Sequence, residues 1–194
     1  LSLTIFEHTP AMAVKGHRIT TPYGTVTAKH IVFACHYPFP LVPGYYFARM
    51  YQERSYVLAL SGAPRLEGMY LGVDPEGLSL RRAGQSLLLG GQSHRTGVQK
   101  NRPYRALASS AHKLFPQAKI WQKWSAQDCI TLDSVPYIGR FSRRNRDWYV
   151  ATGFGKWGMT LSMVSAHLLT DLICKRTSPY EALYSPLRFP ALSA

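Results

Sequence analysis

Hydrophobic positions recur at helical spacing behind a short apolar run near the end of the chain. Trp148, Tyr149 and Val150 form an aromatic and β-branched run that ends at Gly153. Apolar side chains then follow at every third or fourth position, namely Trp157, Leu161, Val164, Leu168, Leu169, Leu172 and Ile173. The pattern predicts a strand, a glycine turn and a buried helix.

Elsewhere the pattern predicts short strands and one further helix. The segment 37–47 contains three prolines and is expected to be irregular, and 90–97, GGQSHRTG, is expected to be a turn. An amphipathic helix is expected over 104–115, stopped by Pro116. The expected strands are 4–7, 14–20, 25–34, 50–60, 69–71, 78–82, 86–89 and 120–131.

Gly153, Gly155 and Gly158 form a literal G-x-G-x-x-G at the start of the predicted helix. The first backbone N–H groups of a helix lack intrahelical partners and carry partial positive charge, so they favour an anion or a carbonyl oxygen. A dinucleotide fingerprint also needs a second strand with an acidic residue. Here Asp171 falls inside the helix and a proline-containing tail follows, so we interpret the unit as the last of a sheet.

The sequence motifs around this unit resemble a known family. TGFGKWGMT (152–160), LDSVPYIGRF (132–141) and WSAQDCITLDSVPYIG (124–139) resemble the C-terminal part of FAD-dependent oxidoreductases of the glycine oxidase and D-amino acid oxidase superfamily. The most similar branch often carries an additional Rieske module. The resemblance covers nearly the whole chain. The superfamily's own G-x-G-x-x-G lies at its N-terminus, ahead of anything found here, so an N-terminal half is expected to be missing.

The resemblance implies an α+β fold, with an antiparallel mixed sheet as substrate domain and the C-terminal part of a Rossmann-like FAD-binding domain. The expected domains are 1–36 with 133–176 for FAD, 37–132 for substrate, and a C-terminal tail, 177–194. The implied activity is oxidation of a C–N bond in an amine or amino acid, with hydride passing to FAD and electrons passing to oxygen or another acceptor. FAD binding is expected to be weak or absent, and turnover absent, without the missing half.

The cofactor residues implied by the resemblance fall in two regions. Val14 would lie by the adenine, and Ala34 and Cys35 beside the diphosphate or ribose; a strand end with a buried thiol is the alternative for Cys35. The helix start would face the pyrimidine oxygen of the flavin. Lys156 is either a cation beside that edge or an exposed turn residue, and Trp157 either covers the ring or belongs to the core. The candidates in this second region are Gly139, Gly153, Phe154, Gly155, Lys156, Trp157, Gly158, Met159 and Thr160.

The candidate substrate residues are Gln127, Asp128 and His94. Amino-acid oxidising members carry an arginine shortly before the Asp-x-x-Pro turn, which clamps the substrate carboxylate. This sequence has Gln127 and Asp128 in that neighbourhood and no arginine. Our hypothesis is that both face the pocket and favour an amine-bearing or other non-carboxylate ligand. His94 is implied to lie near the active site, and a solvent-exposed loop residue is the alternative.

Composition narrows the class of protein. The chain has 194 residues, of which 46% are hydrophobic, so it can bury a core. Its net charge of +13 suits nucleic acid, anionic lipid or an anionic cofactor. The basic residues are scattered, and the one tight cluster, Arg140 to Arg146, lies in a predicted turn, which favours a solvated loop over a nucleic-acid site. No 18-residue apolar run or leader is found, so no membrane partner and a cytoplasmic location are expected.

Cysteine and histidine spacing indicate no further prosthetic group. Cys35, Cys129 and Cys174 form no C-x-x-C pair, so reduced and mostly buried thiols are expected. Cys129 does not match the family's covalent attachment position, so flavin binding is expected to be non-covalent. The dispersed histidines predict no metal.

A second hypothesis is a non-catalytic module. Part of a flavin domain exposes apolar sheet edges, which favours pairing with another copy of the chain or with a lost partner chain.

Overall fold

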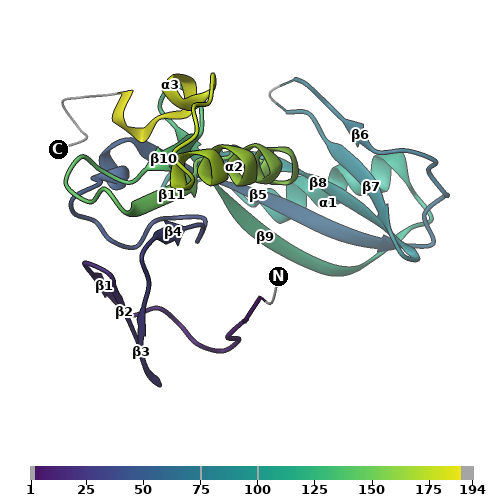
Figure 1. Cartoon of the computed structure of the whole chain (residues 1–194). Coiled ribbons are helices and arrows are strands. Elements are labelled where there is room, and N and C mark those ends of the chain that lie inside the picture. The colour runs from purple at the N-terminus through teal and green to yellow at the C-terminus, as the bar shows by residue number, and fades with distance from the viewer. Residues whose placement is uncertain (1–2, 75, 100, 189–194) are drawn as a thin grey trace. The chain divides into compact units, whose positions relative to one another are not determined.

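Strands dominate the chain, and two longer helices pack on them. The computed structural model describes residues 3–74, 76–99 and 101–188, and it confirms the expected α+β class. The elements in chain order are β1 (Ala13–Lys15), β2 (Arg18–Thr21), β3 (Gly24–Thr27), β4 (Ile31–Phe33), η1 (Tyr46–Ala48), β5 (Met50–Ser61), β6 (Tyr70–Leu71), β7 (Ser79–Ala83), β8 (Ser86–Arg95), α1 (Pro103–Leu114), β9 (Lys119–Thr131), β10 (Tyr137–Arg140), β11 (Trp148–Thr152), α2 (Gly158–Ile173), α3 (Glu181–Tyr184) and η2 (Pro186–Arg188) (Figure 1).

The chain divides into two compact units. Unit 1 comprises residues 1–50 and 129–194, and unit 2 comprises residues 51–128. These boundaries place the proline-rich segment 37–47 with unit 1, whereas the sequence-based division put it in the substrate domain. The assignment of FAD binding and substrate binding to the predicted domains stays a prediction.

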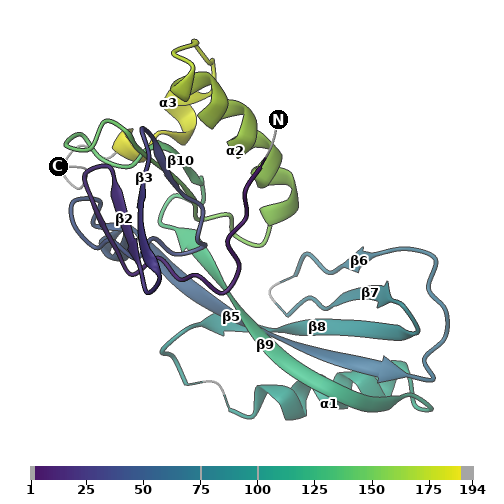
Figure 2. The same cartoon turned by 60° about the horizontal axis from the view of Figure 1, so that its bottom comes forward.

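Unit 1 is built on a three-stranded sheet in the order β10-β11-β4. β10 pairs antiparallel with β11, from Tyr137↔Thr152 to Arg140↔Tyr149, and β11 pairs parallel with β4. Every residue of β11 is buried. The α2 side chains Leu168, Leu169 and Leu172 pack against Ile138, Tyr149 and Ala151. The helix α2 lies beside β10 (Figure 2). β1, β2 and β3 form a separate antiparallel meander.

Unit 2 is a five-stranded antiparallel sheet covered by one helix. The strand order is β6-β7-β8-β5-β9. Leu107 and Ala111 of α1 pack on the leucines of β5 and β8, and this cluster forms the core of the unit. The predicted helix over 104–115 and the predicted strands over 50–60 and 120–131 are confirmed.

Four sequence-based predictions were wrong in detail. Residues 4–7 form no strand, and their apolar side chains are exposed rather than packed on a neighbour. The segments 14–20 and 25–34 each divide into two strands. Gly16 causes the first break, because its positive φ of 56° closes a turn between β1 and β2.

The fourth wrong prediction is the turn over 90–97, because β8 continues to Arg95. Pairing of β8 with β5 extends to Glu53↔Arg95, beyond a shift in register that falls between Arg54 and Tyr56 of β5. Gln92, at φ 59°, absorbs this shift as a β-bulge. Gly90 and Gly91 therefore lie within the strand, and the turn covers only Thr96 and Gly97.

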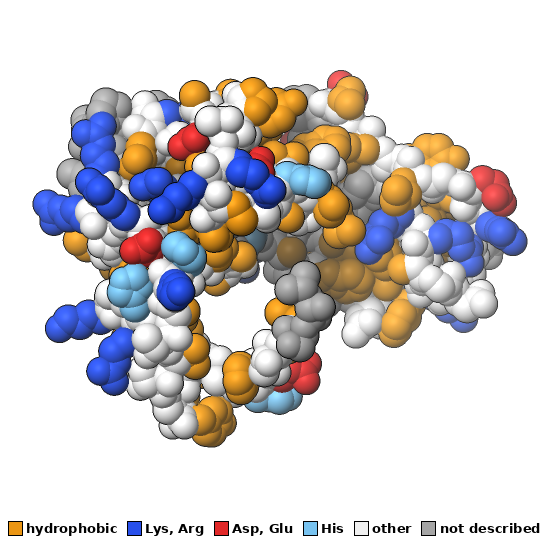
Figure 3. Space-filling view, in the orientation of Figure 1, with side chains coloured by type: hydrophobic (Ala, Val, Ile, Leu, Met, Phe, Trp, Pro, Cys, Tyr) orange, Lys and Arg blue, Asp and Glu red, His pale blue; other side chains and the backbone are white. Residues whose placement is uncertain are grey.

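Surface properties agree with the sequence in part. Arg140, Arg143, Arg144 and Arg146 are all exposed, and basic side chains gather over the part of unit 1 that carries β10 and β11 (Figure 3).

Cys129 is buried, but Cys35 and Cys174 are exposed free thiols, so the expectation of mostly buried thiols was wrong. Within the described residues, no helix combines the length and apolar character needed to cross a membrane.

Candidate functional site

The turn between β11 and α2 has an unusual backbone that is fixed to the end of β9. Gly153, Gly155 and Lys156 have φ values of 75°, 52° and 75°. The Gly155 amide donates to the Cys129 carbonyl at 3.1 Å, and Phe154 forms an isolated bridge with Ile130. Glycine adopts such angles at little cost, which explains why glycine stands at positions 153 and 155 of the G-x-G-x-x-G motif. The turn therefore holds one defined conformation against β9.

A cavity of about 490 Å³ lies beside this turn, within unit 1. Its walls come from the turn and the first residues of α2, from the end of β9, and from the loop that follows β9. The lining residues are Ile130, Thr131, Ser134, Pro136, Gly153, Phe154, Gly155, Trp157, Thr160 and Leu161. We call this the ring cavity. Apolar walls with a few hydroxyl groups are typical of small-molecule sites.

The start of α2 forms one wall of the ring cavity. Trp157 is the N-cap residue, without a side-chain cap, and the Leu161 amide donates to the Trp157 carbonyl at 2.9 Å. The amides of Gly158, Met159 and Thr160 precede that first helical bond, so they have no acceptor within the helix. No acidic residue lies in the first turn. This end of α2 is therefore electropositive.

A second cavity, of about 430 Å³, shares Gly153 and Phe154 with the ring cavity in its lining. Ala34 and His36, which follow β4, line it together with α2. His36 has a φ of 63°, and its carbonyl oxygen accepts a hydrogen bond from Thr152 Oγ1. The lining residues are Ala34, His36, Ala151, Thr152, Gly153, Phe154, Ser162, Ser165, Ala166 and Leu169.

The structure brings half of the predicted cofactor residues to these two cavities. Gly153, Phe154, Gly155, Trp157 and Thr160 line the ring cavity, and Ala34 lines the second. The nearby candidates Lys156, Gly158 and Met159 belong to the same turn and helix start. Trp157 is 63% exposed, so its alternative role as a core residue was wrong.

Three other predicted cofactor residues have different surroundings. Val14 packs against the core of unit 1 from the meander. The Cys35 thiol is exposed and donates to the Tyr37 carbonyl at 3.4 Å. A Cβ on Gly139 would lie 2.9 Å from Pro186 Cδ, so the neighbour that requires glycine there is the C-terminal segment. Their roles toward a cofactor stay predictions.

His94 lies in β8, half-buried, and not in an exposed loop. Its Nδ1 lies 3.0 Å from the Arg95 carbonyl oxygen, which can only accept, so Nδ1 carries the hydrogen. Nε2 then accepts a hydrogen bond from the Tyr56 hydroxyl, also at 3.0 Å. Both ring nitrogens are engaged, and the rings of Tyr56 and His94 are stacked.

Gln127 is the centre of a polar network in unit 2. Its Oε1 accepts from Arg54 at 3.1 Å, and its Nε2 donates to Gln52 at 2.7 Å and to Thr96 at 3.1 Å. Asp128 is the next residue of β9, and consecutive strand residues point to opposite faces. Gln127 and Asp128 therefore cannot both line one pocket on this sheet.

The loop after β9 carries two cavity-lining residues that sequence reasoning missed. Ser134 and Pro136 line the ring cavity, and Asp133 forms an ion pair with Arg188 of η2. Hydrogen bonds from Arg188 hold the pKa of Asp133 below its usual value, against the raising effect of partial burial. The aspartate-to-proline motif was visible in the sequence, but a partner 55 residues away was not.

No group of three or more potential metal ligands occurs in the part of the chain that the structure describes.

Comparisons with known proteins identify the family and proteins of similar fold. The family model described as FAD dependent oxidoreductase matches residues 1–172. YhfW of Bacillus subtilis, which is named as a Rieske 2Fe-2S iron-sulfur protein, is 40% identical over 198 residues, covering 95% of this chain and 38% of that protein. Glycine oxidase from Geobacillus kaustophilus has a similar fold, with a TM-score of 0.75, 23% identity, and coverage of 94% of this chain and 53% of the other.

L-proline dehydrogenase from P. horikoshii gives a TM-score of 0.73 at 19% identity, over 95% of this chain and 55% of the other. The chain thus spans between about two fifths and just over half of the length of these relatives. Because the family model covers most of the sequence, the chain belongs to the FAD dependent oxidoreductase family.

Proposed function

We propose that this chain supplies the flavin-ring site and the substrate-binding sheet of an enzyme that oxidises a C–N bond in an amine or amino acid. The observation that carries the proposal is the ring cavity, where an electropositive helix start and a glycine turn meet apolar walls in a chain of this family. Unit 1 would hold FAD, and unit 2 would bind substrate.

The residues of the ring cavity fit a flavin by their chemistry. A flavin ring is flat and largely apolar, with carbonyl oxygens along one edge. Ile130, Phe154 and Leu161 offer apolar contacts, and the lining residues Ser134 and Thr160 carry hydroxyls that would offer hydrogen bonds. Gly155 has only Ile130 Cδ1, at 3.6 Å, near the position of a Cβ, so its backbone is open to close approach.

The chain's own contribution would be orientation and charge. FAD, when bound, supplies the hydride-accepting chemistry. The amides of Gly158, Met159 and Thr160 would hold the carbonyl edge of the ring, and Lys156 in the exposed turn would add positive charge beside it. Trp157 would shield one side of the ring from water.

In unit 2, Asp128 is the residue that would select the substrate. It is half-buried, and it lies in the neighbourhood where the resemblance implies an arginine for the substrate carboxylate. A carboxylate at this position attracts an ammonium group and repels a carboxylate. Gln127 instead supports the sheet through its network, and His94 is fixed by Tyr56. An amine-bearing substrate is therefore favoured.

We also propose that FAD needs residues outside this chain for tight binding. The dinucleotide phosphates are usually held by a glycine-rich turn within a β-α-β unit. The only G-x-G-x-x-G of this sequence lies in the closing β11–α2 unit. The chain alone is expected to bind FAD weakly and to show no turnover.

Reduction of the bound flavin tests the proposed function. The protein that carries this chain with its FAD would be mixed anaerobically with amines and amino acids, and the visible flavin band followed. Bleaching by an amine supports the proposal. A flavin that no amine or amino acid reduces would contradict it.

One observation favours the alternative, a self-associating or partner-binding module. β4 lies at the edge of its sheet, and Val32 on that strand is 43% exposed. Such an edge can pair with another strand. Sedimentation of the chain at high salt would show a dimer if this role holds, and a monomer if it does not.

A further inference from the structure

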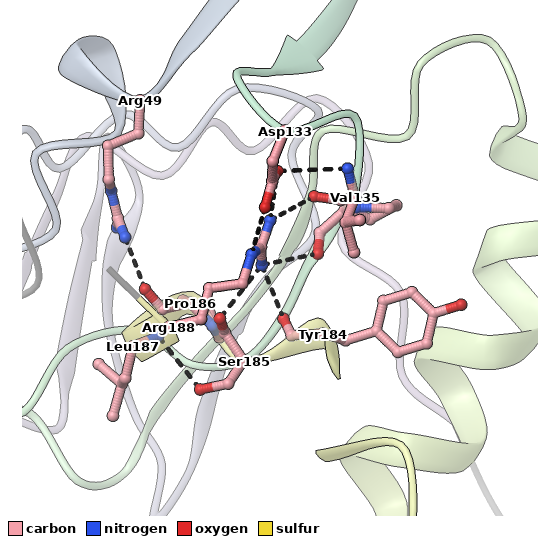
Figure 4. Close-up of polar contacts among 9 residues, drawn as sticks. Arg49, Asp133, Val135, Tyr184, Ser185, Pro186, Leu187 and Arg188 are labelled. Carbon is pink, nitrogen blue, oxygen red and sulfur yellow. Dashed lines mark hydrogen bonds and ion pairs between the residues drawn. The ribbon is translucent and has the colours of Figure 1, made fainter. Parts of the chain in front are cut away.

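The C-terminal segment Glu181–Arg188 is docked on unit 1 rather than extended from it. α3 and η2 lie against β10 and the loop Asp133–Pro136 (Figure 4). Pro186 is buried and fits against Gly139, where a side chain would collide with it. The segment therefore has a shaped receptor in the fold.

Arg188 connects this segment to the loop with every nitrogen of its guanidinium. Nε and Nη2 donate to the two carboxylate oxygens of Asp133 at 2.7 and 2.8 Å. Nη2 also donates to the Val135 carbonyl at 2.5 Å, and Nη1 to the Pro136 carbonyl at 3.2 Å. Nη1 further contacts carbonyls of its own segment. A bidentate arginine contact of this kind fixes geometry as well as charge.

A second arginine holds the same segment from the other side. Arg49 is 1% exposed, and it donates to the Pro186 carbonyl at 2.6 Å and to the Gly44 carbonyl at 2.7 Å. The Tyr137 ring lies within reach of both cations, 4.8 Å from Arg49 and 4.1 Å from Arg188. Tyr137 is fully buried. The segment is thus anchored to the core next to the loop.

The loop presents alternate residues to Arg188 and to the ring cavity. Asp133 and Val135 bind Arg188, whereas Ser134 lines the cavity. Pro136 does both, because its carbonyl accepts from Arg188 and the residue lines the cavity. Ser134 has a φ of 61°, a left-handed conformation that is unfavourable for a non-glycine residue and persists only where its surroundings hold it.

We propose that Arg188 is a positioning residue for the ring cavity: it holds the loop Asp133–Pro136, and with it the Ser134 and Pro136 wall, in the binding conformation. The identity of the ligand as a flavin ring rests on the proposed function, but the effect on the wall does not. The C-terminal segment would then be part of the site without touching the ligand.

Hydrogen exchange of the Ser134 and Val135 amides tests the effect on the wall directly. Both amides bond within the loop, to the Thr131 carbonyl and to Asp133 Oδ1. In Arg188→Ala we expect their exchange to be about tenfold faster or more, while α2 and β11 exchange as in the wild type. Arg176→Ala is the matched control, because Arg176 pairs with Asp171 at 2.9 Å in the same C-terminal part of the chain and is more exposed.

Riboflavin titration of the protein that carries this chain, with its FAD removed and tryptophan emission followed, tests the effect on the ligand. We expect Arg188→Ala to weaken binding about fivefold or more, Arg188→Lys to recover part of the loss, and Arg176→Ala to match the wild type. If Arg188→Ala fails to fold, Arg188→Lys and Arg188→Gln carry both measurements. Unchanged exchange in the loop, or uniform acceleration across unit 1, would overturn the proposal. Riboflavin that fails to bind even the wild type would refute the proposed function, while the exchange result would still decide the role of Arg188.

Discussion

The backbone of Gly153 lies directly against the side chain of Thr131, so that a Cβ on Gly153 would overlap Thr131 Cγ2. Both residues line the ring cavity. The contact joins the end of β11 to the end of β9, and it leaves no space for any other residue at position 153.

Gly153→Ala is therefore expected to lower the free energy of unfolding by about 2–4 kcal/mol, since the positive φ and the overlap both act. Gly16→Ala is the matched control in the same unit, because Gly16 also has a positive φ, of 56°, but has no atom within 4 Å of the Cβ position. It should cost only about 1 kcal/mol. If urea unfolding showed the same loss of unfolding free energy for Gly153→Ala and Gly16→Ala, the contact with Thr131 would be unimportant for stability.

Acid is expected to destabilise unit 1 through Asp133. The folded-state pKa of Asp133 lies below its unfolded value, because Arg188 stabilises the carboxylate. The contribution of the ionised Asp133 to the free energy of unfolding is therefore complete above the pKa of this residue in the unfolded state. It is lost as the pH falls through the pKa in the folded state, which is the lower of the two. Asp133→Asn should be less stable near neutral pH by about 1–3 kcal/mol, and its unfolding free energy should fall less steeply below about pH 4. Parallel pH curves for the two proteins would contradict this.

His94 is expected to carry its hydrogen on Nδ1. The Arg95 carbonyl accepts from Nδ1, and the Tyr56 hydroxyl donates to Nε2. Long-range proton–nitrogen correlation spectra distinguish the two tautomers. Tyr56→Phe removes the donor and should shift the Nε2 resonance, whereas an Nε2-protonated ring in the wild type would be inconsistent with the structure.

The preference of the enzyme for amine-bearing over carboxylate-bearing substrates is expected to depend on Asp128. In the protein that carries this chain with bound FAD, Asp128→Asn should weaken turnover of amines, because the ammonium group loses its counter-charge. Glu67→Gln is a control, since Glu67 is exposed and pairs with Arg65 on the surface of the same unit. An unchanged substrate profile in Asp128→Asn would exclude a role for this residue in selection.

Periodicity predicted the parts of the fold that depend on local pattern. The spacing of Leu168, Leu169 and Leu172 identified α2, and the aromatic run before Gly153 identified β11. The glycine turn and helix start, and hence half of the ring cavity, could therefore be found from sequence. The family resemblance, which the family model confirms, came from the same motifs.

The remaining parts depend on contacts between distant segments. The strand that continues through Gly90 and Gly91 is held by its pairing with β5, which overrides the turn preference of glycine. The conformation of the cavity wall at Ser134 depends on Arg188, which lies in the segment that the sequence predicted to be a C-terminal tail. Hydrophobic pattern carries no information on such polar pairs.

Riboflavin binding to the protein that carries this chain, with its FAD removed and the ring cavity filled by a substitution, tests the central claim most directly. Thr160→Phe places a large side chain in the cavity at the start of α2, and Thr170→Phe places the same side chain at an exposed position on the same helix. We expect Thr160→Phe to weaken riboflavin binding about tenfold or more and Thr170→Phe to leave it unchanged. Equal affinity in the two variants and the wild type, or no riboflavin binding by the wild type, would show that the cavity beside Gly153 is not a flavin site.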